Sequence, residues 1–119
     1  MIKSISIKEL LPIIEQVNLI DIRTIAKYND NHIPGAINIQ MEDLMINPSK
    51  YISKNKRYYI YCQKGLASTN LVSILSKLGY DVVSVSGGYE GWLLEKWVTW
   101  LTFMFKLCYN KNRWLMWNI

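Results

Sequence analysis

The sequence contains little cysteine and little histidine, and both shortages limit the chemistry that it can use. Two cysteines among 119 residues, Cys62 and Cys108, argue against the disulfide framework of a small secreted domain. The only histidine is His32, so no histidine lies near Cys62 in the sequence to act as its base. A chemical role for Cys62 therefore has to rest on the residues immediately around it.

The N-terminal sequence also lacks the apolar core of a signal peptide. In "MIKSISIKELLPIIEQ", the charged residues Lys8, Glu9 and Glu15 interrupt the apolar run, and no small-residue cleavage site follows. We therefore expect a cytoplasmic, reducing setting, in which a cysteine on a loop is more often catalytic or redox-active than disulfide-bonded.

Basic charge is present but is not concentrated in one place. The net charge is +5, from 14 Lys and Arg against 9 Asp and Glu, and the only small cluster is Lys54, Lys56 and Arg57. No basic stripe with interleaved aromatic residues occurs in the first ninety residues. The pattern indicates a solvated basic face and predicts no nucleic-acid partner.

Strand and helix patterns alternate along the first ninety residues. Half of the residues are hydrophobic, and the length suits one domain with its own core, without metal or disulfide staples. Ser6 is suited to cap a helix, and Gly79 to end one. Residues 26–31 form a polar, Asn-rich segment, followed by a turn at residues 32–35. We predict an α/β fold with a parallel sheet covered by helices on both faces. The predicted strands are 3–7, 18–22, 36–39, 57–62 and 81–88, and the predicted helices are 8–17, 41–48 and 68–80.

The stretch "CQKGLAS" joins the predicted strand 57–62 to the predicted helix 68–80. In such a connection, backbone N–H groups and the helix dipole stabilise an anion, and here that anion would be the thiolate of Cys62. Gly65 permits the turn, Lys64 adds positive charge, and Ser68 can both cap the helix and donate a hydrogen bond to the sulfur. The alternative is that Cys62 is an inert buried cysteine that packs as a small hydrophobe.

Three motifs in the same order give the chain a resemblance to the rhodaneses, a family of sulfurtransferases. "CQKGLAS" resembles their active-site loop, "LIDIRT…HIPGAINI" resembles two earlier elements, and "VVSVSGGYEGW" resembles their closing element. The resemblance covers about residues 4–95. It implies a five-stranded parallel sheet with helices on both sides, with a rhodanese-like domain at 1–95 and an atypical apolar tail at 96–119.

The resemblance also implies a reaction. Cys62 would take a sulfane sulfur from a donor such as thiosulfate and pass it, through a persulfide, to cyanide or a thiol acceptor. No metal or cofactor is implied. Of the residues outside the loop, His32 is assigned to a turn, and Asp21 and Arg23 form either a structural ion pair or, through Arg23, a substrate contact. The implied substrate-binding residues are Gln63, Lys64, Gly65, Leu66, Ala67, Ser68 and Arg23, and the residues implied to close the fold are Gly87, Gly88 and Trp92.

One departure from the family pattern keeps other functions open. The family commonly has arginine where this chain has Ala67, so the loop lacks a planar cation for an anionic donor, and Lys64 replaces it only as a point charge. A non-catalytic persulfide carrier, a rhodanese-like binding module and a thiol redox sensor therefore remain alternatives. Phosphoryl transfer is disfavoured, because the related phosphatase and arsenate reductase loops are one residue longer and end in arginine.

The last part of the chain has a different composition. All five tryptophans follow residue 91, and polar residues form only a narrow stripe of helical spacing at Glu95, Thr99, Thr102 and Lys106. We expect a helix that is too short to span a bilayer. It would dock on its own domain, form a homodimer or lie, less favourably, on a membrane, and an altered reading frame is a further explanation of the tail. We expect Cys108 to be buried.

Overall fold

The sheet contains five parallel strands. The structure, a computed structural model, describes residues 3–118, with side-chain surroundings for residues 3–108. The strand order is β1-β5-β4-β2-β3, and all four pairings are parallel. The predicted fold class is thereby confirmed. The strands are β1 (Ser4–Ile5), β2 (Asn18–Asp21), β3 (Ile37–Asn38), β4 (Arg57–Tyr61) and β5 (Asp81–Val85).

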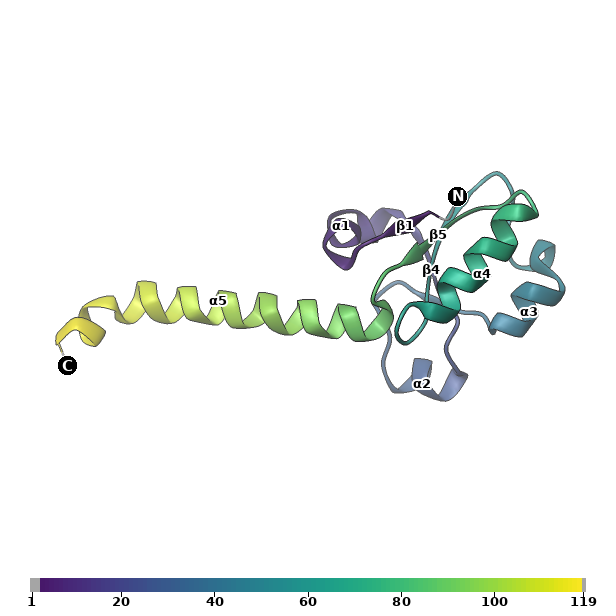
Figure 1. Cartoon of the computed structure of the whole chain (residues 1–119). Coiled ribbons are helices and arrows are strands. Elements are labelled where there is room, and N and C mark those ends of the chain that lie inside the picture. Colours follow the sequence, from purple (N-terminus) through teal and green to yellow (C-terminus); the bar gives the residue numbers. More distant parts are fainter. Residues whose placement is uncertain (1–2, 119) are drawn as a thin grey trace.

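Helices cover both faces of this sheet (Figure 1). Alternation along β4 sends Tyr58 and Ile60 into one hydrophobic cluster and Tyr59 and Tyr61 into the other, as the period of two in a strand requires. The first cluster lies under α3 and α4, and the second lies under α1, η1 and the start of α5. The helices are α1 (Ile7–Leu10), η1 (Leu11–Gln16), α2 (Ile25–Asp30), α3 (Met41–Ile46), η2 (Pro48–Lys50), α4 (Leu66–Lys77) and α5 (Gly88–Asn118).

Three local predictions need correction. The predicted helix 8–17 is divided, because Pro12 falls in the first turn of the 3-10 helix η1, where its missing N–H is tolerated. The segment predicted as a polar turn contains α2, which begins after the N-cap residue Thr24. Ser68 does not cap α4, because this helix already begins at Leu66 with Gly65 as its N-cap. The predicted cap at Ser6 is confirmed, since Ser6 and Glu9 form a capping box.

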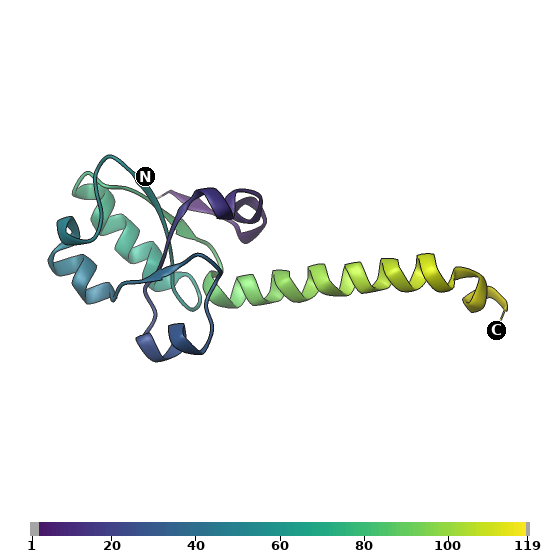
Figure 2. The ribbon, with the colours of Figure 1, turned by 180° about the vertical axis from the view of Figure 1, so that it is seen from behind.

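The tail is helical, as predicted, but it does not dock on its own domain. The start of α5 contacts the domain through Tyr89 and Trp92, which are buried in the second cluster. From there α5 projects away, so that the molecule measures 65 × 29 × 22 Å (Figures 1 and 2). Cys108 is exposed rather than buried, because no other element covers this part of α5 within the described residues. Across the described part of the chain, no helix is long and apolar enough to cross a membrane.

Candidate active site

Cys62 lies directly after β4, at the edge of the sheet where the parallel strands end. Its side chain is 7% exposed. The Gly65 N–H donates to Cys62 Sγ at 3.0 Å, and the Ser68 N–H donates to it at 3.3 Å. The sulfur thus lies inside the turn that leads into α4, where backbone donors and the positive end of the helix dipole stabilise a negative charge.

Glycines allow this loop to close around the sulfur. Gly65 has a φ of +107°, and a Cβ atom there would lie 3.1 Å from the backbone nitrogen of Gly87. Gly88, with a φ of +58°, leaves even less room, because a Cβ atom there would overlap the backbone oxygen of Cys62. Only glycine combines these backbone conformations with such close approach. The Gly87–Gly88 pair therefore shapes the floor of the cysteine loop.

The start of α5 is bonded to the same loop. The Tyr89 N–H donates to the Cys62 carbonyl at 2.8 Å, and the Glu90 N–H donates to the Gln63 carbonyl at 3.0 Å. In addition, Gln63 Nε2 donates to Glu90 Oε2 at 3.2 Å. Two helix N-termini thus meet at Cys62, with α4 donating to the sulfur and α5 to the backbone carbonyls.

Two buried serines lie beneath the sulfur. Ser68 Oγ lies 3.5 Å from Cys62 Sγ and 2.9 Å from the hydroxyl of Ser84 on β5. A protonated thiol donates to the Ser68 hydroxyl, whereas a thiolate accepts from it. The predicted contact between Ser68 and the sulfur is therefore present, although Ser68 lies within the helix rather than at its cap.

The surroundings favour the thiolate. Burial alone would raise the pKa of Cys62, because it disfavours the charged form. Hydrogen bonds from the side chain and backbone of Ser68, and from the backbone of Gly65 and Lys64, outweigh burial and hold the pKa below its ordinary value. These hydrogen bonds at Cys62 thus favour a thiolate over an inert cysteine packed as a hydrophobe.

An open pocket of about 390 Å³ gives access to Cys62. Five of the predicted site residues besides Cys62 line it, whereas Gly65 and Ser68 contact the sulfur from the loop and the first turn of α4. Lys64 and Leu66 are exposed at its rim, so the wall combines positive charge with apolar surface. The lining residues are Ile22, Arg23, Thr24, Lys27, Cys62, Gln63, Lys64, Leu66 and Ala67.

Arg23 belongs to this wall but is largely committed to structural contacts. Its Nη2 donates to Asp21 Oδ2 at 2.8 Å and to the Asn31 carbonyl at 2.6 Å, and its guanidinium lies 3.9 Å from the ring centre of Tyr89. Burial alone would lower the pKa of Arg23, but hydrogen bonds and the charge of Asp21 raise it above its ordinary value. The Asp21–Arg23 pair is therefore a buried structural ion pair. Only the 3.5 Å contact from Arg23 Nη1 to Gln63 Oε1 points toward the loop.

Several residues of the site were missed by the sequence analysis. Lys27 lines the pocket from α2, a helix that was itself not predicted. The contact of Glu90 with Gln63 joins residues 27 positions apart, so no local pattern indicates it. Ser84 did carry a signal, because it is a polar residue inside the apolar strand sequence "DVVSV".

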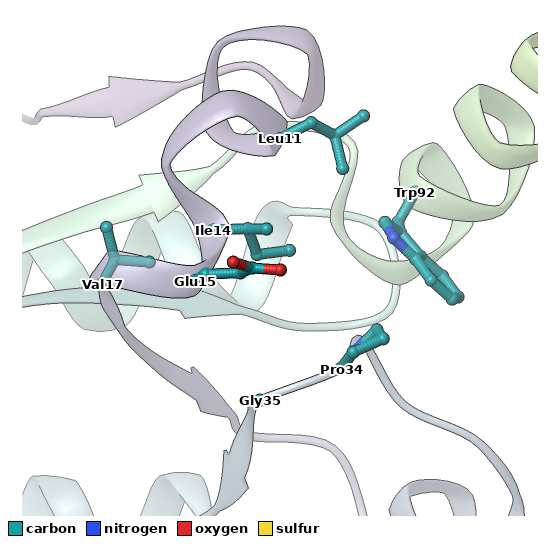
Figure 3. A pocket seen from close by; sticks show the side chains of 7 residues that line it. All are labelled: Leu11, Ile14, Glu15, Val17, Pro34, Gly35 and Trp92. Carbon is teal, nitrogen blue, oxygen red and sulfur yellow. The ribbon is translucent and has the colours of Figure 1, made fainter.

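His32 and a larger hollow are separate from this chemistry. His32 stacks on Tyr28 and does not line the cysteine pocket. A hollow of about 540 Å³ lies on the other face of the sheet, where Trp92 faces η1 and Pro34 (Figure 3). Glu15 is the only titratable residue in its wall, so this hollow offers no thiol to carry sulfur. The smaller pocket at Cys62 is therefore the candidate active site.

A parallel α/β sheet that holds a cysteine against the first turn of a helix defines a class of thiol-bearing domains. The chain belongs to the Rhodanese-like domain family, whose model matches residues 6–95. A sulfurtransferase of Allochromatium vinosum is 35% identical over 92 residues, which are 76% of this chain and 85% of that protein. The thiosulfate sulfurtransferase PspE of Escherichia coli is 31% identical over 87 residues, covering 72% of this chain and 84% of that protein.

A solved structure resembles this chain over the same region. The crystal structure of a rhodanese-related protein from Thermoplasma volcanium has a TM-score of 0.72 and 30% sequence identity, covering 78% of this chain and 92% of that one. The family model ends at residue 95, so most of α5 lies outside it.

Proposed function

We propose that this protein is a sulfurtransferase that carries a sulfane sulfur on Cys62. The observation that supports this most is the set of hydrogen bonds to Cys62 Sγ, from the N–H groups of Gly65 and Ser68 at 3.0 and 3.3 Å. These donors stabilise a thiolate without a histidine, and they lie at the bottom of an open pocket. The named sulfurtransferase relatives are 31% and 35% identical to this chain over the aligned regions.

The reaction needs no oxidant and no cofactor. The Cys62 thiolate attacks the outer sulfur of thiosulfate, the sulfur–sulfur bond of thiosulfate breaks, and sulfite leaves with its electron pair. A thiolate acceptor or cyanide then attacks the outer sulfur of the Cys62 persulfide. Cys62 leaves as a thiolate, which the same N–H groups stabilise, so the enzyme returns to its starting state.

The pocket wall favours an anionic donor but lacks an arginine that is free to bind it with two hydrogen bonds. Lys64 and Lys27 bring two positive charges to the rim, whereas Arg23 is neutralised by Asp21. Ala67 stands where the family resemblance predicts an arginine that would bind an oxyanion with two parallel hydrogen bonds. We therefore assign donor binding to Lys64, Lys27 and the backbone of the loop, with Gln63, Leu66 and Ala67 shaping the wall.

A persulfide carrier is the second candidate, and Ala67 is the observation that favours it. A carrier receives its sulfur from a persulfide rather than from free thiosulfate, so it has no need of the missing arginine. We assign either role to residues 1–95 and treat 96–119 as an appended segment. The thiol must be reduced in both cases, which fits the cytoplasmic setting that we propose.

The intact mass of the protein after incubation with thiosulfate tests this function. We expect the wild type to gain one sulfur atom and to lose it again with cyanide. The Cys62→Ser variant should gain none. Loading from a persulfide donor but not from thiosulfate would indicate the carrier. A chain that gains no sulfur from either donor would contradict both proposals, and Cys108→Ser serves as the matched control that keeps Cys62.

A further inference from the structure

The outer part of α5 carries an apolar seam. Its members recur at alternating spacings of four and three residues, as the a and d positions of a heptad do over two heptads. The polar stripe of Glu95, Thr99, Thr102 and Lys106 takes the c and f positions on the opposite side of the helix. The helix thus has one side suited to packing and another suited to water. The seam consists of Leu93, Trp97, Trp100, Met104 and Leu107.

Most of this seam is exposed on the isolated chain, whereas Leu93 packs against the second hydrophobic cluster. Trp97 is 59% exposed and Trp100 is 50% exposed, and apolar side chains beside them extend the same surface. The exposed residues on and beside the seam, Leu94, Trp97, Trp100, Leu101, Phe103 and Met104, together present roughly 700 Å². That exceeds the largest apolar patch of a typical monomer, about 300–600 Å². It also approaches the ~800 Å² that each partner contributes to a stable interface.

The exposed apolar surface of α5 has a self-complementary shape. Trp97 and Trp100 meet edge to face, with 5.9 Å between ring centres, and form a ridge. Beside this ridge lies an apolar hollow of about 430 Å³. Four of its residues follow the spacing i, i+3, i+4 and i+7 of a hole that receives a side chain of a facing helix, and one of them is Thr99 at the edge of the polar stripe. The residues of the hollow are Lys96, Thr99, Trp100 and Phe103 from α5, with Leu11 and Trp92 at one end.

A ridge next to a hollow on the same helix is what a two-fold symmetric interface requires, because each copy offers both parts. The exposed area favours the same occupant, because it is close to the ~800 Å² that each partner contributes to a stable interface. We propose that a second copy of this chain packs its α5 seam on this one, leaving Glu95, Thr102 and Lys106 of each polar stripe in water.

Molecular mass in solution tests this proposal. Sedimentation equilibrium of the full chain should give at least the dimer mass over the micromolar range. Trp97→Glu and Trp100→Glu, each placing a charge in the seam, should return the mass to that of the monomer. Thr102→Glu adds the same charge on the polar stripe and should leave the assembly intact. Circular dichroism establishes that each variant keeps its helix.

A wild-type chain that stays monomeric at high concentration would overturn the proposal. So would an assembly whose mass Trp97→Glu and Trp100→Glu leave unchanged. A monomer that instead binds vesicles of anionic phospholipid would show that a membrane surface covers the seam. Sulfur loading at Cys62 does not depend on any of these outcomes, so the two proposals can fail separately.

Discussion

The cysteine loop and the outer part of α5 lie in one chain but are built in opposite ways. The loop is made of small and polar residues whose backbone donors and serine hydroxyls converge on one sulfur atom. Within the described residues, no buried side-chain nitrogen or oxygen lacks a hydrogen-bond partner. The outer helix instead presents large apolar side chains that its own domain does not cover. The first region is complete within a single chain, whereas the second leaves apolar side chains uncovered.

The two regions are joined at the first turn of α5. Its N–H groups at Tyr89 and Glu90 bond the carbonyls of Cys62 and Gln63, and the same helix then leaves the domain. Changes at this junction should therefore affect the whole domain. Changes farther along α5 should affect assembly alone. Substitutions in the two regions should separate these effects, and their expected sizes decrease from Gly88 to Trp97.

Gly88→Ala should cause the largest loss of stability. Its Cβ atom would overlap the Cys62 backbone oxygen, so backbone must shift, and we expect a loss of about 3 kcal/mol in the free energy of unfolding. Gly35→Ala is the matched control, because its φ of +89° is also positive but nothing lies within 4 Å. It should cost only about 1 kcal/mol. Urea denaturation of both variants measures the difference. Equal losses would contradict the close approach of Gly88 to the Cys62 backbone.

Ala67→Arg should improve the use of thiosulfate. The new guanidinium would reach the pocket that Ala67 lines and form charge-assisted hydrogen bonds with the donor. Such bonds are worth about 1.5 kcal/mol or more, so KM for thiosulfate should fall about 10-fold. Ala67→Gln adds a polar, uncharged side chain and serves as the control. An equal improvement by Ala67→Gln would show that shape, and not charge, limits donor binding.

Lys27→Met and Lys64→Met should each raise KM for thiosulfate by a smaller factor. Exposed charges interact weakly with a ligand in water, so we expect about 3-fold for each at low ionic strength. Added salt should reduce the difference from wild type. Lys77→Met, at the far end of α4, is the control and should leave KM unchanged. An effect of Lys77→Met as large as that of Lys27→Met would indicate general charge attraction rather than a site.

Trp97→Glu should have the smallest effect on sulfur transfer. Trp97 lies outside the cysteine pocket and beyond the turn that bonds the loop. The rate of sulfur loading should therefore stay within about 2-fold of wild type, as expected for sites without shared contacts. A larger loss, measured by intact mass against time, would show that assembly and the cysteine loop are coupled.

The parts of the site that follow from local sequence were predictable, and those that depend on distant contacts were not. The apolar strand ending at Cys62 and the glycine three residues later indicated a cysteine in a turn before a helix, and the structure contains this arrangement. The prediction that Ser68 caps α4 was wrong, because Gly65 takes the N-cap position. The Ser68 N–H instead donates to the sulfur.

Lys27 and Glu90 had no comparable local signal. The helix α2 that carries Lys27 is short, rich in polar residues and without any buried residue, so no apolar period reveals it. Glu90 reaches Gln63 only because β4 and β5 are adjacent parallel strands, so the segments that follow them lie together. The prediction that Cys108 is buried was also wrong. The apolar sequence around Cys108 does not reveal whether the rest of the domain packs against that part of α5.

The most direct test of the account is the pH dependence of Cys62 alkylation by iodoacetamide, in a Cys108→Ser background. Below the pKa of Cys62 the protonated thiol reacts slowly, and above it the thiolate reacts fast. Because hydrogen bonds hold that pKa low, half-maximal rate should come below the ordinary value of about 8.5. Ser68→Ala should move the midpoint to higher pH, and Ser73→Ala, farther along α4, should not. A midpoint at or above the ordinary value, unchanged by Ser68→Ala, would contradict the claim that this loop creates a stabilised thiolate.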